Sequence, residues 1–127
     1  MRFALSIGLA LFMLGGQVGY AGESDPKIAD VNVRLDSADQ PGIFHIKVVI
    51  EHQDKGWDDY VDAWEILGSD GRLLGSRPFF EPELERAKTV SALSGVVIPN
   101  DVKTVTIRAR KHPEGYKGEP VEITVPH

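Results

Sequence analysis

A strict alternation of apolar and polar residues through positions 43–51 constrains the fold more than any other feature of this chain. Four apolar side chains would share one face of the segment: Phe44, Ile46, Val48 and Ile50. Successive side chains of a β-strand point to opposite faces, so this pattern predicts a strand with one face in a core. Similar runs recur at 31–36, 60–67, 72–77, 90–98, 102–111 and 120–125.

Turn-forming residues separate these runs, and Ser69-Asp70-Gly71 is the strongest hairpin signal among them. No segment keeps a helical period over several turns. Roughly seven short strands in about 100 residues are typical of one all-β domain. We therefore predict an immunoglobulin/fibronectin III-like β-sandwich over residues 28–127, preceded by a short polar lead at 22–27.

The first 21 residues predict a signal peptide. Arg2 gives a short positive start, residues 3–15 form an apolar run, and Gly19 and Ala21 are the small residues that a signal peptidase reads. We expect cleavage after Ala21, which would leave no membrane anchor and would place the protein in the periplasm or outside the cell. The chain has no cysteine, which excludes a lipid-modified N-terminus and any disulfide.

The net charge of -5 argues against a nucleic-acid partner. We expect no stretch that clusters lysine and arginine on one face, whereas proteins that follow a phosphate backbone need such a cluster. Acidity of this kind favours solubility, cation capture or docking of a basic partner.

The C-terminal stretch VKTVTIRARKHPEGYKGEPVEITVP, residues 102–126, resembles the last two strands and connecting hairpin of fibronectin type III domains. This resemblance implies a fold and says nothing about a ligand.

A second resemblance is more specific. The stretch GWDDYVDAWEILGSDGRLLGSR at 56–77, with LSGVVIP and VTIRAR further on, resembles a group of small uncharacterised exported bacterial proteins that share a GWD-x-Y-x-D-x-WE pattern. That group tends to carry histidine at the position of Asp59 and His-Pro-His at the position of Glu81-Pro82-Glu83. The resemblance implies that carboxylates have replaced imidazoles here, which argues against a transition-metal role.

Aromatic and acidic residues crowd the segment 57–64, and we predict structural roles for four of them: Trp57, Tyr60, Asp62 and Trp64. Trp64 falls where sandwiches of this type bury a large aromatic side chain. Asp62 precedes it by two residues, so we expect it on the same face near the rim. Trp57 would cover the open end of the core.

A metal site is the sharper hypothesis for the same region. It would use His52, Asp59, Glu81 and Glu83, because the turn before the third strand and the segment after the fourth can approach each other in a sandwich. Mixed imidazole and carboxylate ligands suit Zn²⁺ or Cu²⁺, and carboxylates alone favour Ca²⁺ or Mn²⁺. The alternative is that these are solvated surface charges, since their spacing matches no Ca²⁺ loop and no zinc motif.

Nothing in the sequence indicates catalysis. A thiol nucleophile is absent, and no serine lies in a Gly-x-Ser-x-Gly elbow. We therefore predict a non-enzymatic exported binding module without a cofactor, acting as a protein-binding or adaptor domain for another exported protein. Its contact surface would be a strand edge, an exposed Phe79-Phe80 pair or the hairpin at 115–118. The alternative function is a small metal-handling protein that uses the four residues above, with a divalent metal bound.

Overall fold

The computed structural model describes residues 25–127, which form eight strands in the described part of the chain. They are β2 (Lys27–Leu35), β3 (Ile43–Glu51), β4 (Tyr60–Gly68), β5 (Leu73–Pro78), β6 (Lys88–Val97), β7 (Thr104–His112), β8 (Gly115–Tyr116) and β9 (Val121–Thr124). The predicted signal peptide and the first residues of the polar lead lie outside the described residues. Among the described residues, no helix is long and apolar enough to cross a membrane.

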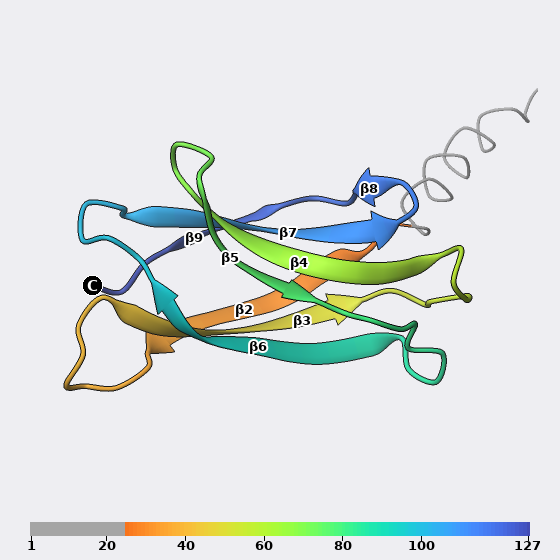
Figure 1. Ribbon diagram of the computed structural model, residues 1–127, viewed down its shortest axis with the longest axis horizontal. Coiled ribbons are helices and arrows are strands. Elements are labelled where there is room, and N and C mark those ends of the chain that lie inside the picture. The colour runs from red at the N-terminus through yellow and green to blue at the C-terminus, as the bar shows by residue number, and fades with distance from the viewer. Residues whose placement is uncertain (1–24) are drawn as a thin grey trace, which may run out of the picture.

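Two antiparallel sheets pack face to face as a β-sandwich (Figure 1). The smaller sheet has the strand order β2-β3-β6, and the larger has the order β5-β4-β7-β8 with β9 also paired to β7. The all-β sandwich predicted from the period-2 runs is thus confirmed. Each predicted run coincides with one strand, and the two-residue strand β8 is an addition within the last hairpin.

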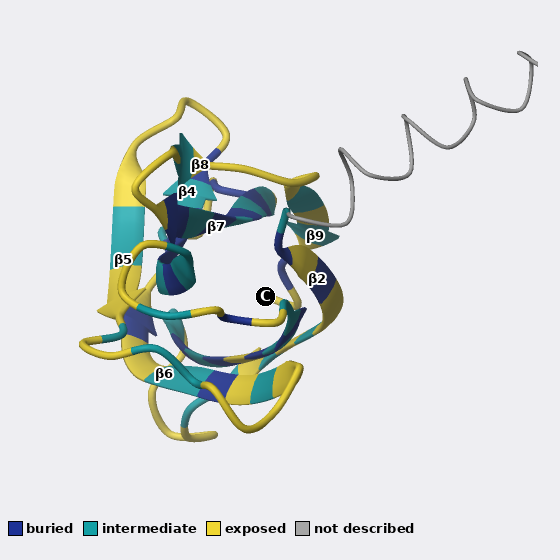
Figure 2. Cartoon of the chain, turned by 90° about the vertical axis from the view of Figure 1, so that its right-hand side faces the viewer, coloured by how far each residue is buried: buried dark blue, intermediate teal, exposed yellow. Residues whose placement is uncertain are grey.

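The core lies between the sheets, where buried residues face one another (Figure 2). All four predicted inward residues of β3 are buried, and Val105, Ile107 and Ala109 follow the same period on β7. Trp64 is fully buried on β4 and donates its Nε1–H to Ser91 Oγ at 2.9 Å. Each such large apolar side chain contributes about 1.5–3 kcal/mol on burial, so this layer supplies most of the stability of a chain without disulfides.

A β-bulge in β4 overturns the prediction for Asp62. The pairing of β4 with β7 shifts register between Val61 and Ala63, which brings Val61 and Trp64 to the inner face although three positions separate them. Asp62 therefore does not share the face of Trp64. Its carboxylate lies on the outer face of the sheet and accepts a hydrogen bond from Arg110 Nε at 2.8 Å.

Two glycines are required by the backbone. Gly71 has φ of +84° in the predicted hairpin between β4 and β5, a conformation that costs other residues energy. Gly118 has φ of +83°, and a Cβ atom there would collide with the carbonyl oxygen of Pro26. The loop between β8 and β9 therefore packs directly on the segment that leads into β2.

Candidate functional site

Two loops meet at one end of the sandwich. The β3–β4 loop covers residues 52–59 and the β5–β6 loop covers residues 79–87, and a backbone hydrogen bond of 2.9 Å from the His52 amide to the Ala87 carbonyl joins them (Figure 1). We call this region the loop end. The opposite end carries the β2–β3 loop at 36–42 and the β6–β7 loop at 98–103.

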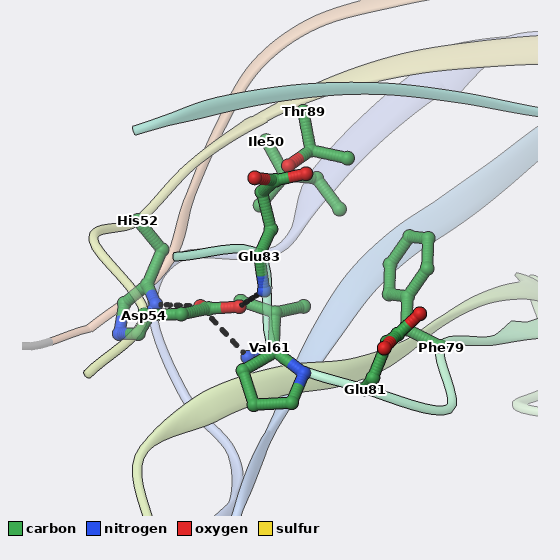
Figure 3. A pocket seen from close by; sticks show the side chains of 9 residues that line it. Ile50, His52, Asp54, Val61, Phe79, Glu81, Glu83 and Thr89 are labelled. Carbon is green, nitrogen blue, oxygen red and sulfur yellow. Dashed lines mark hydrogen bonds and ion pairs between the residues drawn. The ribbon is translucent and has the colours of Figure 1, made fainter. Parts of the chain in front are cut away.

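Asp54 holds the loop end together through three hydrogen bonds. Its Oδ1 atom faces His52 Nδ1 at 2.6 Å and accepts from the Val61 amide at 3.2 Å, and its Oδ2 atom accepts from the Glu83 amide at 2.8 Å (Figure 3). Asp54 is only 7% exposed. A buried carboxylate is costly unless it is hydrogen-bonded, and here one carboxylate connects both loops and the start of β4.

His52 lies between two carboxylates. Its side chain is almost fully buried, with Nδ1 directed at Asp54 and Nε2 lying 3.4 Å from Asp59 Oδ1. Asp59 Oδ1 is itself buried and makes no hydrogen bond within the described residues, so ion pairing is what compensates it. The lysine at that oxygen is Lys111, whose Nζ lies 3.5 Å away.

Lys111 is a buried lysine on the inner face of β7, with 3% of its surface exposed. Burial alone would lower its pKa, but the hydrogen bond to Glu114 at 2.9 Å and the charges of Asp59 and Glu114 outweigh that penalty. The pKa of Lys111 is therefore raised above its ordinary value of 10.5. The lysine stays charged and forms the inner member of a chain of alternating charges.

A pocket of about 180 Å³ opens between the two loops. Its apolar lining includes Ile50, Val61 and Phe79, and the first two of these belong to the buried core. Its polar lining includes His52, Asp54, Glu81 and Glu83. Glu81 is exposed and Glu83 is partly exposed, so the pocket has an apolar floor and a carboxylate rim.

The structure brings together three of the four predicted metal ligands. His52, Glu81 and Glu83 line the pocket. Asp59 does not line it, and its Oδ1 atom lies near Nε2 of His52. Among residues 25–127, no group of three or more histidine, aspartate and glutamate side chains is placed to hold a metal ion. The four-residue metal site stays a prediction.

The predicted structural residues of 57–64 have different outcomes. Trp64 is buried as expected, but the prediction for Trp57 was wrong, because 63% of its surface is exposed. It packs edge-on against Tyr60 with ring centroids 5.7 Å apart and does not close the core. Tyr60 also contacts the ring of His112 at the end of β7, so this aromatic pair packs next to the last hairpin. The two residues of the Phe79-Phe80 pair also differ in their surroundings. Phe79 lines the pocket, whereas Phe80 is 80% exposed.

A second charged network lies on the outer face of the larger sheet. Glu65 receives a hydrogen bond from Arg108 Nε at 3.0 Å and one from the Tyr116 hydroxyl at 2.6 Å, and the Arg108 guanidinium lies 3.6 Å from the centre of the Tyr116 ring. The hydrogen bond to Glu65, helped by burial, raises the pKa of Tyr116 above 10.0, although Arg108 and Arg110 oppose the shift. This network fastens the predicted contact hairpin at 115–118 to the sheet.

Sequence reasoning missed Asp54 and Lys111, the two buried charges of the loop end. Lys111 had a readable signal, because it continues the inward phase of Val105, Ile107 and Ala109. Asp54 lies in a loop without periodicity, and its position two residues after His52 is the one local hint.

Comparison of the chain with known protein families, with curated proteins and with solved structures finds no match. The two resemblances seen in the sequence therefore stay predictions.

Proposed function

We propose that this protein is a non-enzymatic binding module that holds another protein at its loop end. The observation that carries the proposal is the pocket between the two loops together with the exposed apolar side chains that the same two loops carry. Trp57 comes from the β3–β4 loop, and Phe80 and Leu84 come from the β5–β6 loop; each is more than half exposed. Exposed aromatic side chains around a concave site on a rigid scaffold are typical of protein-binding surfaces.

The geometry of His52 supports binding over catalysis. In a catalytic triad, one imidazole nitrogen faces a carboxylate and the other faces a nucleophile. Here Nδ1 faces Asp54 and Nε2 faces Asp59, so a carboxylate also occupies the place that a nucleophile would take. Thr89 lines the same pocket and has a hydroxyl group, but Nε2 faces Asp59. The arrangement fixes the imidazole as part of the scaffold of the loop end.

An immunoglobulin/fibronectin III-like kinship and export from the cytoplasm are part of the same proposal. The first, second and fifth described strands form one sheet, and the third strand carries the buried Trp64. Both features support the kinship. The fourth strand, β5, pairs with β4 in the larger sheet, unlike the fourth strand of a constant-type immunoglobulin domain. Export rests on residues 1–21, with the periplasm or the medium as the destination.

The metal-handling alternative has less support. Both nitrogens of His52 already face carboxylates, and a metal would have to displace one of these contacts. The carboxylates of Glu81 and Glu83 could still attract a hard cation, since oxygen ligands suit such ions. We keep this function as the second candidate, and thermal melts with added metal ions test it.

Site-specific photo-crosslinking tests the binding proposal. A photo-reactive phenylalanine analogue at position 80 should give a discrete crosslinked protein in the cells that export this chain, and an excess of unlabelled purified protein should compete it away. The same analogue at Asp101, in the β6–β7 loop at the opposite end, is the matched control. Equal products from both positions, or no product from position 80, would contradict a partner at the loop end.

A further inference from the structure

We propose that the pocket at the loop end accepts an arginine or lysine side chain of the partner protein. This inference rests on the proposed function and names the chemistry that the site recognises. Three observations carry it: the composition of the pocket walls, the state of the two rim carboxylates and the concentration of charge at this end of the molecule.

The pocket walls match a side chain that is apolar along its length and charged at its tip. Ile50, Val61 and Phe79 offer an apolar floor, while Glu81 and Glu83 stand at the more exposed rim. Lysine and arginine bury a hydrocarbon stem while the charged head stays near water. A metal ion or a small inorganic cation has no stem, so it would leave the apolar floor unused.

The two rim carboxylates retain capacity for a cation. No hydrogen bond or ion pair of the Glu81 carboxylate occurs within the described residues. Glu83 Oε2 accepts from the Glu85 amide at 3.1 Å, and its Oε1 atom lies 3.9 Å from an exposed arginine, Arg86. Exposed pairs at that distance contribute little, so an incoming guanidinium can replace Arg86 at small cost.

Negative charge is concentrated at this end. The segments 51–59 and 79–88 together hold seven acidic side chains against three basic ones, a formal charge of -4 in a chain whose total is -5. Such a concentration attracts a basic partner over a distance of about a Debye length, roughly 8 Å at physiological ionic strength. The pocket lies inside this field.

The acidic rim is also held in place before a ligand arrives. Asp54 accepts the Glu83 amide, and the same carboxylate is bonded to the Val61 amide at the start of β4. The backbone at Glu83 therefore does not have to be ordered when a ligand binds, which lowers the entropic cost of recognition. Figure 3 shows these hydrogen bonds among the residues that line the pocket.

Binding of a minimal probe tests the inference. N-acetyl-arginine amide should shift the backbone amide resonances of Val61, Glu83 and Thr89 in a saturable way, and N-acetyl-citrulline amide, which has nearly the same shape without the charge, should not. The double substitution Glu81→Gln with Glu83→Gln should weaken binding of the arginine probe at least about fivefold. The affinity should also fall as salt is added.

The matched control removes two carboxylates at the other end, by Asp39→Asn with Asp101→Asn. This variant should bind the arginine probe like the parent protein. Equal shifts from the citrulline probe, no shifts from either probe, or unchanged affinity in the Glu81→Gln, Glu83→Gln variant would overturn the inference. If the loop end binds a partner in another way, the crosslink from position 80 should still form. The two experiments therefore distinguish a wrong ligand chemistry from a wrong binding proposal.

Discussion

The two ends of the sandwich are closed by different chemistry. At the opposite end, backbone hydrogen bonds dominate, such as the Asp36 amide to the Ile43 carbonyl at 2.9 Å and the Ile98 amide to the Gly42 carbonyl at 3.0 Å. The carboxylate that helps there, Asp36, bonds the Gly95 amide while it stays accessible to solvent. At the loop end, the buried side chains of Asp54 and Lys111 add connections to backbone hydrogen bonds such as that from the His52 amide to the Ala87 carbonyl.

The difference teaches where this fold departs from the simplest solution. Backbone hydrogen bonds close a loop without burying charge, whereas a buried ion pair has a desolvation penalty that can exceed its attraction. One end shows that this chain can close a sandwich by the simpler route. Departures from local rules concentrate at functional sites, so the charged end is the better candidate for function.

The largest effect should come from the core that both ends share. Trp64→Ala should lower the free energy of unfolding by about 3–5 kcal/mol, because it removes a fully buried aromatic side chain from a close-packed layer. Urea denaturation measures this. Trp57→Ala is the matched control and should change stability by less than about 0.5 kcal/mol, since Trp57 is mostly exposed. Similar losses from both substitutions would show that Trp57 belongs to the core.

The difference between the two ends can be tested directly by removing one carboxylate from each. Asp54→Ala should cost about 2–4 kcal/mol, because it leaves His52 and two backbone amides of the loop end without their acceptor. Asp36→Ala at the opposite end should cost only about 0.5–1 kcal/mol, because water can replace its carboxylate. Denaturant midpoints of the two variants decide the matter. Equal costs would erase the asymmetry described above.

Alkaline pH should remove the contribution of Lys111 at the loop end to the free energy of unfolding. Its pKa is raised in the folded state, so its contribution is fully present below the unfolded value of 10.5 and is lost as pH rises through the folded value. A single group of this kind adds a slope of at most about 1.4 kcal/mol per pH unit in that window. Unfolding at pH 8 to 12 should show a steeper loss in the parent protein than in Lys111→Met. Parallel curves would mean that Lys111 does not couple to folding.

A smaller effect is expected from the partly buried network on the outer face. Tyr116→Phe removes the hydroxyl that bonds Glu65 and should cost less than about 1 kcal/mol, because the Tyr116 side chain is 41% exposed and Glu65 keeps its hydrogen bond from Arg108. The raised pKa of Tyr116 has the same sign as that of Lys111, with its stabilisation lost as pH rises above 10.0. Tyrosinate absorbance at 295 nm follows this ionisation. A pKa at or below 10.0 would contradict the bond to Glu65.

The smallest effect should come from metals. A cation bound to the native state at 100-fold above its Kd adds about 2.7 kcal/mol of stability. We expect thermal melts with Cu²⁺, Zn²⁺ or Ca²⁺ to show no gain of that size, because His52 is engaged on both sides. A gain that disappears in Asp59→Asn with Glu83→Gln would favour the metal-handling function. Replacing Asp59, Glu81 and Glu83 by histidine should move any preference toward Zn²⁺ or Cu²⁺.

The strands could be predicted from the sequence because the period-2 pattern records burial directly. The inward phase of β3 follows from that pattern alone, whereas the burial of Trp64 was predicted from the position at which such sandwiches bury a large aromatic side chain. The bulge at Asp62 could not be predicted, since an extra residue in a strand leaves no compositional mark when both neighbours are apolar. One register shift was therefore enough to place Asp62 on the wrong face.

The site was predictable only in part, for a related reason. The proximity of His52 to the segment at 81–83 followed from sandwich topology, and the structure places them in one pocket. Asp54 makes its bonds to residues 7 and 29 positions away in sequence, so no local pattern reports them. Loop residues that bond to distant backbone amides carry no period from which burial can be read.

The bulge in β4 has a consequence for how fast a partner can bind. Val61, in the wall of the pocket, and Trp64, in the middle of the core, lie on the same strand on either side of the bulge, and both pair with β7. This part of the proposed binding surface is therefore formed before any encounter, and no slow rearrangement of the wall would have to precede or follow docking. Association should appear as a single kinetic phase whose observed rate rises in proportion to partner concentration.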